Sequence, residues 1–168
     1  MTAPTSTEFL TALASGKGVD RVSVHLASAA ISVGEARRFV EKQLVFWGFP
    51  PGEDLVQRVV LTVSELATNA VLHGRANPSA EDELIEVALV LKPDFALGVA
   101  VTDDSNAVPL TPASPSVTAT RGRGLVLVSA LADSWITAPR RRHEVSRGKD
   151  VWAFFRCRET SVALSRTA

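Results

Sequence analysis

One long apolar segment, between Gly52 and Gly74, places the strongest constraint on how this chain can fold. Its apolar residues recur every three or four positions, which is the spacing of one face of an α-helix. Glu53 and Asp54 stand in the first turn, where the helix dipole favours negative charge. The apolar face is formed by Leu55, Val59, Val63, Leu66 and Ala70. A helix with such a face has to pack on other elements, so the segment predicts a layered structure.

The same helix carries three polar residues on a second face. Glu65, Asn69 and His73 are spaced four residues apart, so they form one stripe along the helix. A glutamate and an amide beside apolar surface each need a polar partner. A Mg²⁺ ion would satisfy both, with Asn69 as its protein ligand and Glu65 holding a water, because Mg²⁺ keeps waters and phosphate oxygens around it. The alternative is that the stripe is an ordinary solvated helix face.

A pair of glycines suggests a phosphate site. Gly122 and Gly124 stand at the start of an apolar helix that we expect over 122–133. Glycines let backbone N–H groups approach a phosphate, and the helix N-terminus adds partial positive charge. Arg121 and Arg123 would supply fixed charges beside it. The alternative is a simple junction between a loop and a helix.

A carboxylate at the end of a predicted strand suggests a site for a base. Asp103 follows the apolar strand expected over 95–101, and its carboxylate can accept a hydrogen bond from an exocyclic amine such as N6 of adenine. The alternative is that Asp103 and Asp104 form a turn, which aspartate pairs often do. Near the end of the chain, Lys149 is expected to be solvated.

The remaining elements follow from apolar periodicity and turn residues. Residues 1–18 are polar and small, and we expect a flexible arm. Ser32 is predicted to cap a helix that runs to about Trp47, with Glu35 as the capping-box partner. Residues 104–121 lack a regular period and are rich in Pro, Ser, Thr and Ala. Strands are expected over 22–26, 84–91, 95–101, 134–138 and 150–157, with a basic turn at 140–143.

Composition excludes several classes of function. Lys plus Arg and Asp plus Glu number 18 each, so the net charge is near zero. A direct nucleic-acid contact through Arg140–Arg142 is therefore disfavoured. The single cysteine, Cys157, rules out a disulfide within the chain and favours a cytoplasmic protein. We expect neither a signal peptide nor a membrane span.

The order of these motifs resembles a known family. ELATNAVLHG at 65–74 and GRGLVLVSALADSW at 122–135 flank a hairpin and a strand that ends in aspartate. This arrangement resembles the histidine-kinase-like ATPase superfamily, the fold of DNA gyrase, sensor histidine kinases and MutL. The chain is most similar there to bacterial anti-sigma-factor serine kinases and their actinobacterial relatives. The resemblance implies a Bergerat fold, an α/β sandwich with helices on one face of a mixed, mainly antiparallel sheet.

The resemblance also implies roles for individual residues, with ATP and Mg²⁺ as cofactors. Glu65 matches the catalytic base, Asn69 the Mg²⁺ ligand, His73 the histidine of the anti-sigma kinases and Asp103 the adenine-reading aspartate. The phosphate loop would comprise Arg121, Gly122, Arg123, Gly124 and Leu125, and residues 105–121 would form a lid over the nucleotide. The implied ATPase domain spans 19–158, followed by a flexible tail over 159–168.

The implied activity is that of a cytoplasmic anti-sigma factor that phosphorylates a small anti-anti-sigma protein of the STAS type. Its other partner would be a sigma factor, and a homodimer is possible in this family. The sequence departs from the superfamily after Asp103, where the pattern D-x-G-x-G is replaced by Asp103–Asp104–Ser105–Asn106–Ala107. Because both glycines are missing, a module that binds nucleotide or a partner without catalysis remains the alternative.

Overall fold

A five-stranded sheet with helices on both faces makes up the protein in the computed structural model, which describes residues 4–14, 16–77, 82–106, 123–142 and 145–157. The strand order is β1-β2-β3-β5-β4, and every pairing in this sheet is antiparallel. The strands are β1 (Asp20–Ala27), β2 (Leu84–Lys92), β3 (Ala96–Asp103), β4 (Ser134–Arg142) and β5 (Val145–Arg156). The helices are α1 (Ser6–Ala14), α2 (Ile31–Phe46), α3 (Asp54–His73) and α4 (Arg123–Leu131). The predicted α/β sandwich is confirmed, but its described strands are all antiparallel rather than mixed, and helices lie on both faces rather than on one.

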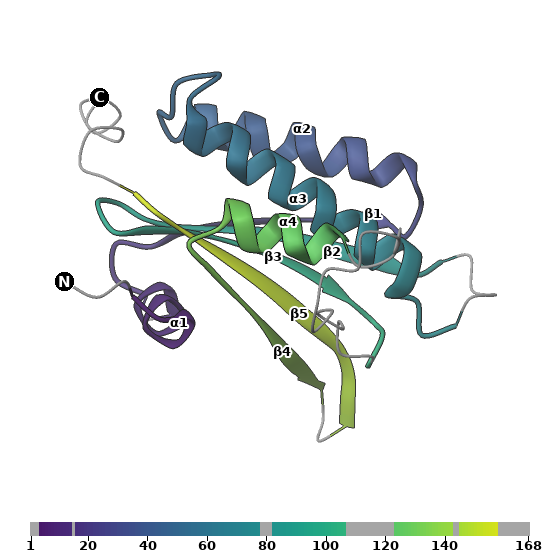
Figure 1. The fold of residues 1–168 in the computed structure, drawn as a ribbon. Coiled ribbons are helices and arrows are strands. Elements are labelled where there is room, and N and C mark those ends of the chain that lie inside the picture. Colours follow the sequence, from purple (N-terminus) through teal and green to yellow (C-terminus); the bar gives the residue numbers. More distant parts are fainter. Residues whose placement is uncertain (1–3, 15, 78–81, 107–122, 143–144, 158–168) are drawn as a thin grey trace.

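The main core lies between the sheet and a layer of three helices, α2, α3 and α4 (Figure 1). The long helix predicted between Gly52 and Gly74 is α3, and it ends where Gly74 caps it. Its buried residues are Val56, Val59, Thr62, Val63, Leu66, Ala67 and Ala70. They pack on the inward side of the central strands, where Val99 and Val101 of β3 are fully buried. The helical spacing in the sequence therefore predicted the face of α3 that forms the core.

The helix α1 covers the opposite face of the sheet from the other three helices (Figure 1). Phe9 is 0% exposed, and its ring stacks on Phe154 of β5 with centroids 5.2 Å apart. The hydroxyl of Ser6 shares a hydrogen bond with the hydroxyl of Ser134 in β4. The expectation of a flexible arm is therefore wrong for Ser6–Ala14. The two buried residues of α1, Phe9 and Leu13, are too few to show a period, yet they complete a second small core.

Two local predictions also need correction. Ser32 is not a helix cap, because α2 begins at Ile31 and Ala30 occupies the cap position without a side-chain hydrogen bond. The hydroxyl of Ser32 is buried and has no hydrogen-bond partner. The arginines at 140–142 belong to β4 rather than to a turn. The strands β4 and β5 extend beyond the expected ranges, because their antiparallel pairing continues to Arg142 opposite Val145.

Length and hydropathy alone would allow α3 to cross a membrane, and it is the one such helix among the described residues. Its mean hydropathy is 1.3 over the relevant window. In the structure its apolar face is buried against the sheet, as in the core helix of a globular domain.

Cys157 follows β5 and is also buried, and burial raises the pKa of its thiol to about 12.

Candidate functional site

Polar contacts hold the C-terminal end of α4 beside the N-terminal half of α3, away from the predicted site. The Arg58 guanidinium on α3 donates from Nε to the carbonyl oxygen of Leu131, the last residue of α4, at 2.8 Å. The same side chain lies 3.8 Å from the carboxylate of Asp133. With the end of α4 held beside the start of α3, the first turn of α4 lies along the C-terminal half of α3.

This arrangement brings Gly124 against the polar stripe of α3. A β-carbon at position 124 would stand 2.9 Å from Oε2 of Glu65 and 3.2 Å from Nδ2 of Asn69. Real β-carbons essentially never come within 3.0 Å of another heavy atom, so with a side chain at position 124 the ends of the Glu65 and Asn69 side chains would have to shift. Glu65 and Asn69 are both half-buried. A carboxylate, an amide and the N-terminal turn of a helix therefore meet at one place, as the sequence motifs predicted.

A second glycine joins the end of α3 to the end of β3. Gly74 is buried, and a β-carbon there would stand 2.6 Å from both Cβ and Cγ of Asp103. It would also stand 2.4 Å from the carbonyl oxygen of Ala70. The missing side chain at 74 therefore lets the carboxylate of Asp103 lie directly under the end of α3. The end of α3, the helix that carries Glu65 and Asn69, therefore packs directly against Asp103 at the end of β3.

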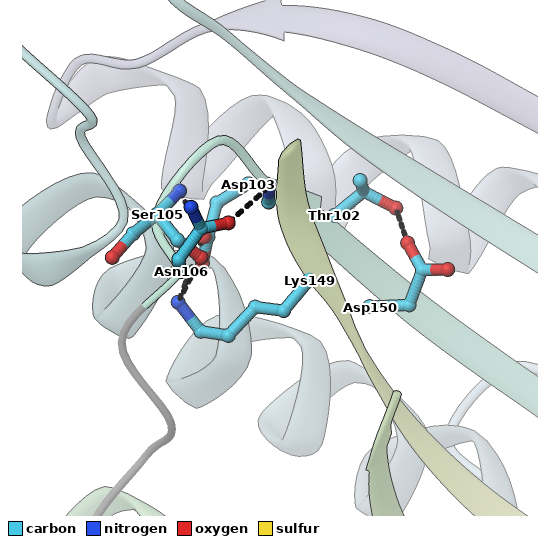
Figure 2. A network of polar contacts seen from close by, with 7 residues as sticks. Thr102, Asp103, Ser105, Asn106, Lys149 and Asp150 are labelled. Carbon is cyan, nitrogen blue, oxygen red and sulfur yellow. Dashed lines mark hydrogen bonds and ion pairs between the residues drawn. The ribbon is translucent and has the colours of Figure 1, made fainter. Parts of the chain in front are cut away.

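Lys149 makes an ion pair with Asp103 inside the protein. Figure 2 shows the side chain of Lys149, on β5, reaching the carboxylate of Asp103. The Nζ atom lies 2.8 Å from Oδ1, and the two residues are opposite each other in the register of β3 and β5. Asp103 is 5% exposed and Lys149 is 7% exposed. The expectation that Lys149 is solvated is therefore wrong, because pairing with a buried carboxylate compensates for the loss of water around its charge.

Burial and pairing act in opposite directions on the Asp103 carboxyl. Burial raises its pKa above the usual value, because it removes water from the charged form. The hydrogen bond and the charge of Lys149 lower the pKa but do not cancel the effect of burial. The backbone N–H of Ser105 also donates to Oδ1 at 3.0 Å. The carboxylate is thus held by two donors from the chain itself.

Two polar contacts hold the residues after Asp103, where Ser105 stands at the first glycine position of the superfamily pattern. Lys149 Nζ lies 3.4 Å from the carbonyl oxygen of Ser105, and the backbone N–H of Gly148 donates to Oδ1 of Asn106 at 2.8 Å (Figure 2). Gly148 has a φ of 84°, and a β-carbon there would stand 2.1 Å from the carbonyl oxygen of Asp103. The turn after β3 is therefore tied to Gly148 and Lys149 in the first half of β5.

The comparisons with known proteins agree with this geometry. The model of the histidine kinase-like ATPase domain matches residues 26–154. The chain belongs to the histidine kinase-like ATPase family. The predicted superfamily is therefore confirmed, and this ATPase domain contains both the α3 stripe and the strand end at Asp103. A search of curated proteins finds no match.

A solved structure shares the fold of this ATPase domain at low sequence identity. It holds the RsbU and RsbW domains of Rv1364c from Mycobacterium tuberculosis, with a TM-score of 0.58 and 17% identity. The match covers 82% of the present chain but 32% of that one, so the chain spans about a third of its length. This structural similarity supports the fold described above for the present chain.

The structure places the other predicted site residues in different surroundings. His73 is exposed at the end of α3, and the side chain of Leu125 is 5% exposed within the main core. Arg121 and Gly122 lie outside the described residues, as does most of the predicted lid. Arg123 begins α4, but its side chain is outside what the structure describes. The predicted binding roles of these five residues stay predictions.

The site also contains residues that the sequence motifs did not reveal. Lys149 and Asn106 lie outside the two long motifs and carry no spacing signal of their own. A hint was the pair Gly148–Lys149 at the start of an apolar strand, since a glycine inside a strand often marks a close backbone approach. In the described part of the chain, no group of three or more His, Cys, Asp or Glu residues is placed to hold a metal ion. A Mg²⁺ ion at Asn69 would need oxygens from phosphate and water.

Proposed function

We propose that this chain binds ATP with Mg²⁺ and acts as an anti-sigma factor that phosphorylates a serine or threonine of a STAS-type anti-anti-sigma protein. The observation that carries the proposal is the contact of Gly124 with Glu65 and Asn69. This contact places three groups beside one another: a potential base, a potential metal ligand and a glycine in the first turn of a helix. Membership of the histidine kinase-like ATPase family supports nucleotide as the ligand.

Each of these residues has a role that its chemistry suits. Asn69 would bind Mg²⁺ through its amide oxygen, and the ion would neutralise phosphate charge when bound. The backbone around Gly122 and Gly124, with Arg121 and Arg123, would hold the phosphates at the start of α4. Glu65 would accept the proton of the attacking hydroxyl, which has to lie within hydrogen-bond reach of its carboxylate. Phosphoryl transfer depends mainly on such positioning and charge neutralisation.

The proposed partners follow from the resemblance and from the structural neighbour. That neighbour contains an RsbW domain and an RsbU domain in the same protein. We propose that the present chain likewise acts in a pathway of regulatory proteins, with a sigma factor and a STAS-type protein as partners. A cytoplasmic location and a possible homodimer belong to the same proposal.

Transfer of labelled phosphate from ATP to a cognate STAS-type protein tests the kinase activity. Glu65→Gln keeps the shape of the side chain but removes the base, so we expect the rate of transfer to fall about 10²- to 10⁴-fold. ATP affinity should stay within a few fold of that of the unmodified chain. Glu41→Gln, an exposed glutamate on α2, is the matched control and should transfer at the normal rate. Undiminished transfer by Glu65→Gln would rule out the assigned base.

A second candidate function is a docking module of the same fold without catalysis. Two observations favour it: both glycines after Asp103 are missing, and Lys149 already pairs with the carboxylate that would contact the base. Calorimetry with ATP and Mg²⁺, combined with the phosphate-transfer assay, separates the candidates. Binding followed by transfer to the partner supports the kinase, binding without transfer supports the module, and no binding removes ATP from either function.

A further inference from the structure

The two oxygens of the Asp103 carboxylate have different surroundings. Oδ1 accepts hydrogen bonds from Lys149 Nζ at 2.8 Å and from the backbone N–H of Ser105 at 3.0 Å. Among the residues that the structure describes, none donates a hydrogen bond to Oδ2. Oδ2 is also not one of the described side-chain atoms that are sealed from solvent without a partner, so it keeps some contact with solvent. Oδ2 is therefore an open acceptor at the end of β3.

Packing and hydrogen bonds fix the orientation of this carboxylate. The two donors to Oδ1 come from different elements, Lys149 from β5 and Ser105 from the turn after β3. The backbone of Gly74 lies against the Asp103 side chain, since a β-carbon at position 74 would stand 2.6 Å from both Cβ and Cγ of Asp103. A carboxylate offers about four acceptor positions, so two bonds to Oδ1 leave those of Oδ2 unused. Lys149 and Ser105 thus use one oxygen inside the protein and leave the other open.

Lys149 also acts on the charge of Asp103. Burial raises the pKa of this carboxyl, whereas the hydrogen bond and the charge of Lys149 lower it. The other charged group acting on it is Asp104 in the same turn, which raises the pKa and is exposed. From α3 the contact is the backbone of Gly74, and the neighbouring His73 is exposed. Lys149 is therefore the side chain that favours the ionised form, which is the stronger hydrogen-bond acceptor.

We infer that Lys149 is a positioning residue of the nucleotide site, because it holds Oδ1 of Asp103 and so presents Oδ2 to the exocyclic amine of a purine base. Lys149 is 7% exposed, so it acts through the carboxylate rather than through a contact of its own with the base. This inference rests on the proposed function, because it takes a nucleotide as the ligand and Asp103 as the residue nearest the base. It adds a residue of β5 to the site.

Calorimetry on the full chain tests the inference with two ligands, Mg·ATP and Mg·purine riboside triphosphate, which is the same nucleotide without the exocyclic amine. The unmodified chain should bind ATP about 10- to 100-fold more tightly, which is the usual range for one hydrogen bond to a charged group. Equal affinity for the two ligands would overturn the inference and leave nucleotide binding by the proposed function standing. Failure of both ligands to bind would overturn the nucleotide part of the proposed function as well. These outcomes need no variant.

Substitution of Lys149 measures its own share in this preference. In Lys149→Met the carboxyl loses a donor and the charge that keeps it ionised, so the preference for ATP should fall to about 3-fold or less, as for a neutral hydrogen bond. Lys149→Arg retains a positive donor and should restore the preference. Lys42→Met, which removes an exposed lysine of α2, is the matched control and should keep the full preference. Circular dichroism on each variant confirms that folded proteins are compared.

The pH dependence separates positioning from a purely structural role. In Lys149→Met the pKa of Asp103 should lie above that in the unmodified chain, because both effects of Lys149 that lower it are gone. The preference for ATP should therefore recover as the pH is raised, and the unmodified chain should reach its full preference at a lower pH. If folded Lys149→Met binds both ligands more weakly by the same factor at every pH, the role of Lys149 is structural and the inference is overturned.

Discussion

At the scale of single residues, the backbone conformation of Gly148 determines how closely β5 approaches Asp103. Its φ of 84° lies in the left-handed region that side chains avoid, and its N–H donates to Asn106. A β-carbon would also collide with the carbonyl oxygen of Asp103. The glycine therefore allows the strand β5 to pass close enough to β3 for Lys149 to reach Asp103.

Replacing Gly148 by alanine should lower the free energy of unfolding for two reasons, the left-handed φ and the collision with Asp103. The left-handed φ costs about 1–2 kcal/mol for a residue with a β-carbon, and the collision adds about 1–3 kcal/mol as in an overpacked core. Gly52→Ala separates the two, because Gly52 has a φ of 81° but no atom within 4 Å of its would-be β-carbon. Urea unfolding of both variants measures the free energies. Equal losses of unfolding free energy in the two variants would contradict the prediction, because they would mean that the collision at position 148 costs nothing.

At the scale of elements, α1 determines how the second face of the sheet is covered. Phe9 stacks on Phe154 and lies 6.0 Å from the ring of Phe95 between centroids. Together with Leu13, Val90 and Ala96, these residues form a core separate from the one under α2, α3 and α4. This small core covers Ala96 on the outer face of β3, a strand that is buried along its whole length.

We expect Phe9→Ala to lower the free energy of unfolding by about 3–5 kcal/mol, the usual cost of removing a fully buried phenylalanine. Phe46→Ala is the matched control, because Phe46 on α2 is 76% exposed and should change stability by less than about 0.5 kcal/mol. Chemical denaturation followed by tryptophan fluorescence is a suitable measurement, since Trp152 lies in the same small core. A loss below that of the control would mean that α1 is dispensable for stability.

At the scale of the whole molecule, the site draws on elements from distant parts of the chain. Glu65 and Asn69 come from α3, Gly124 from α4, Asp103 from β3 and Lys149 from β5. A ligand that bridges them would bind the folded chain and have no equivalent site in the unfolded one. Binding should therefore be visible as added stability.

ATP with Mg²⁺ should raise the melting temperature, because a ligand at 100 times its Kd adds about 2.7 kcal/mol to the free energy of unfolding. Chelation of Mg²⁺ by EDTA should abolish most of this gain, and Asn69→Ala should make the gain independent of Mg²⁺. Gln57→Ala removes another amide of α3 and should keep the full response. Differential scanning fluorimetry measures all four cases. The same gain with and without EDTA would exclude a role of Mg²⁺ in binding.

The sequence by itself determined the two motifs and the main elements of the fold, with the exception of the helix α1. The period of apolar residues in α3 and the spacing of Glu65 and Asn69 are local properties of one helix, so they could be predicted from neighbouring residues alone. The hairpin of β2 and β3 follows from two apolar runs around the turn at Lys92–Asp94. The motif order pointed correctly to the histidine kinase-like ATPase family.

Only the tertiary structure decided which distant side chains meet. The pairing of Lys149 with Asp103 depends on the register between β3 and β5, which are separated by the long segment after Asn106. The packing of α1 depends on a gap on the far face of the sheet that no local pattern describes. Local spacing determines which way a side chain points along its own helix or strand, whereas contacts across the sheet arise from the combined packing of all the elements.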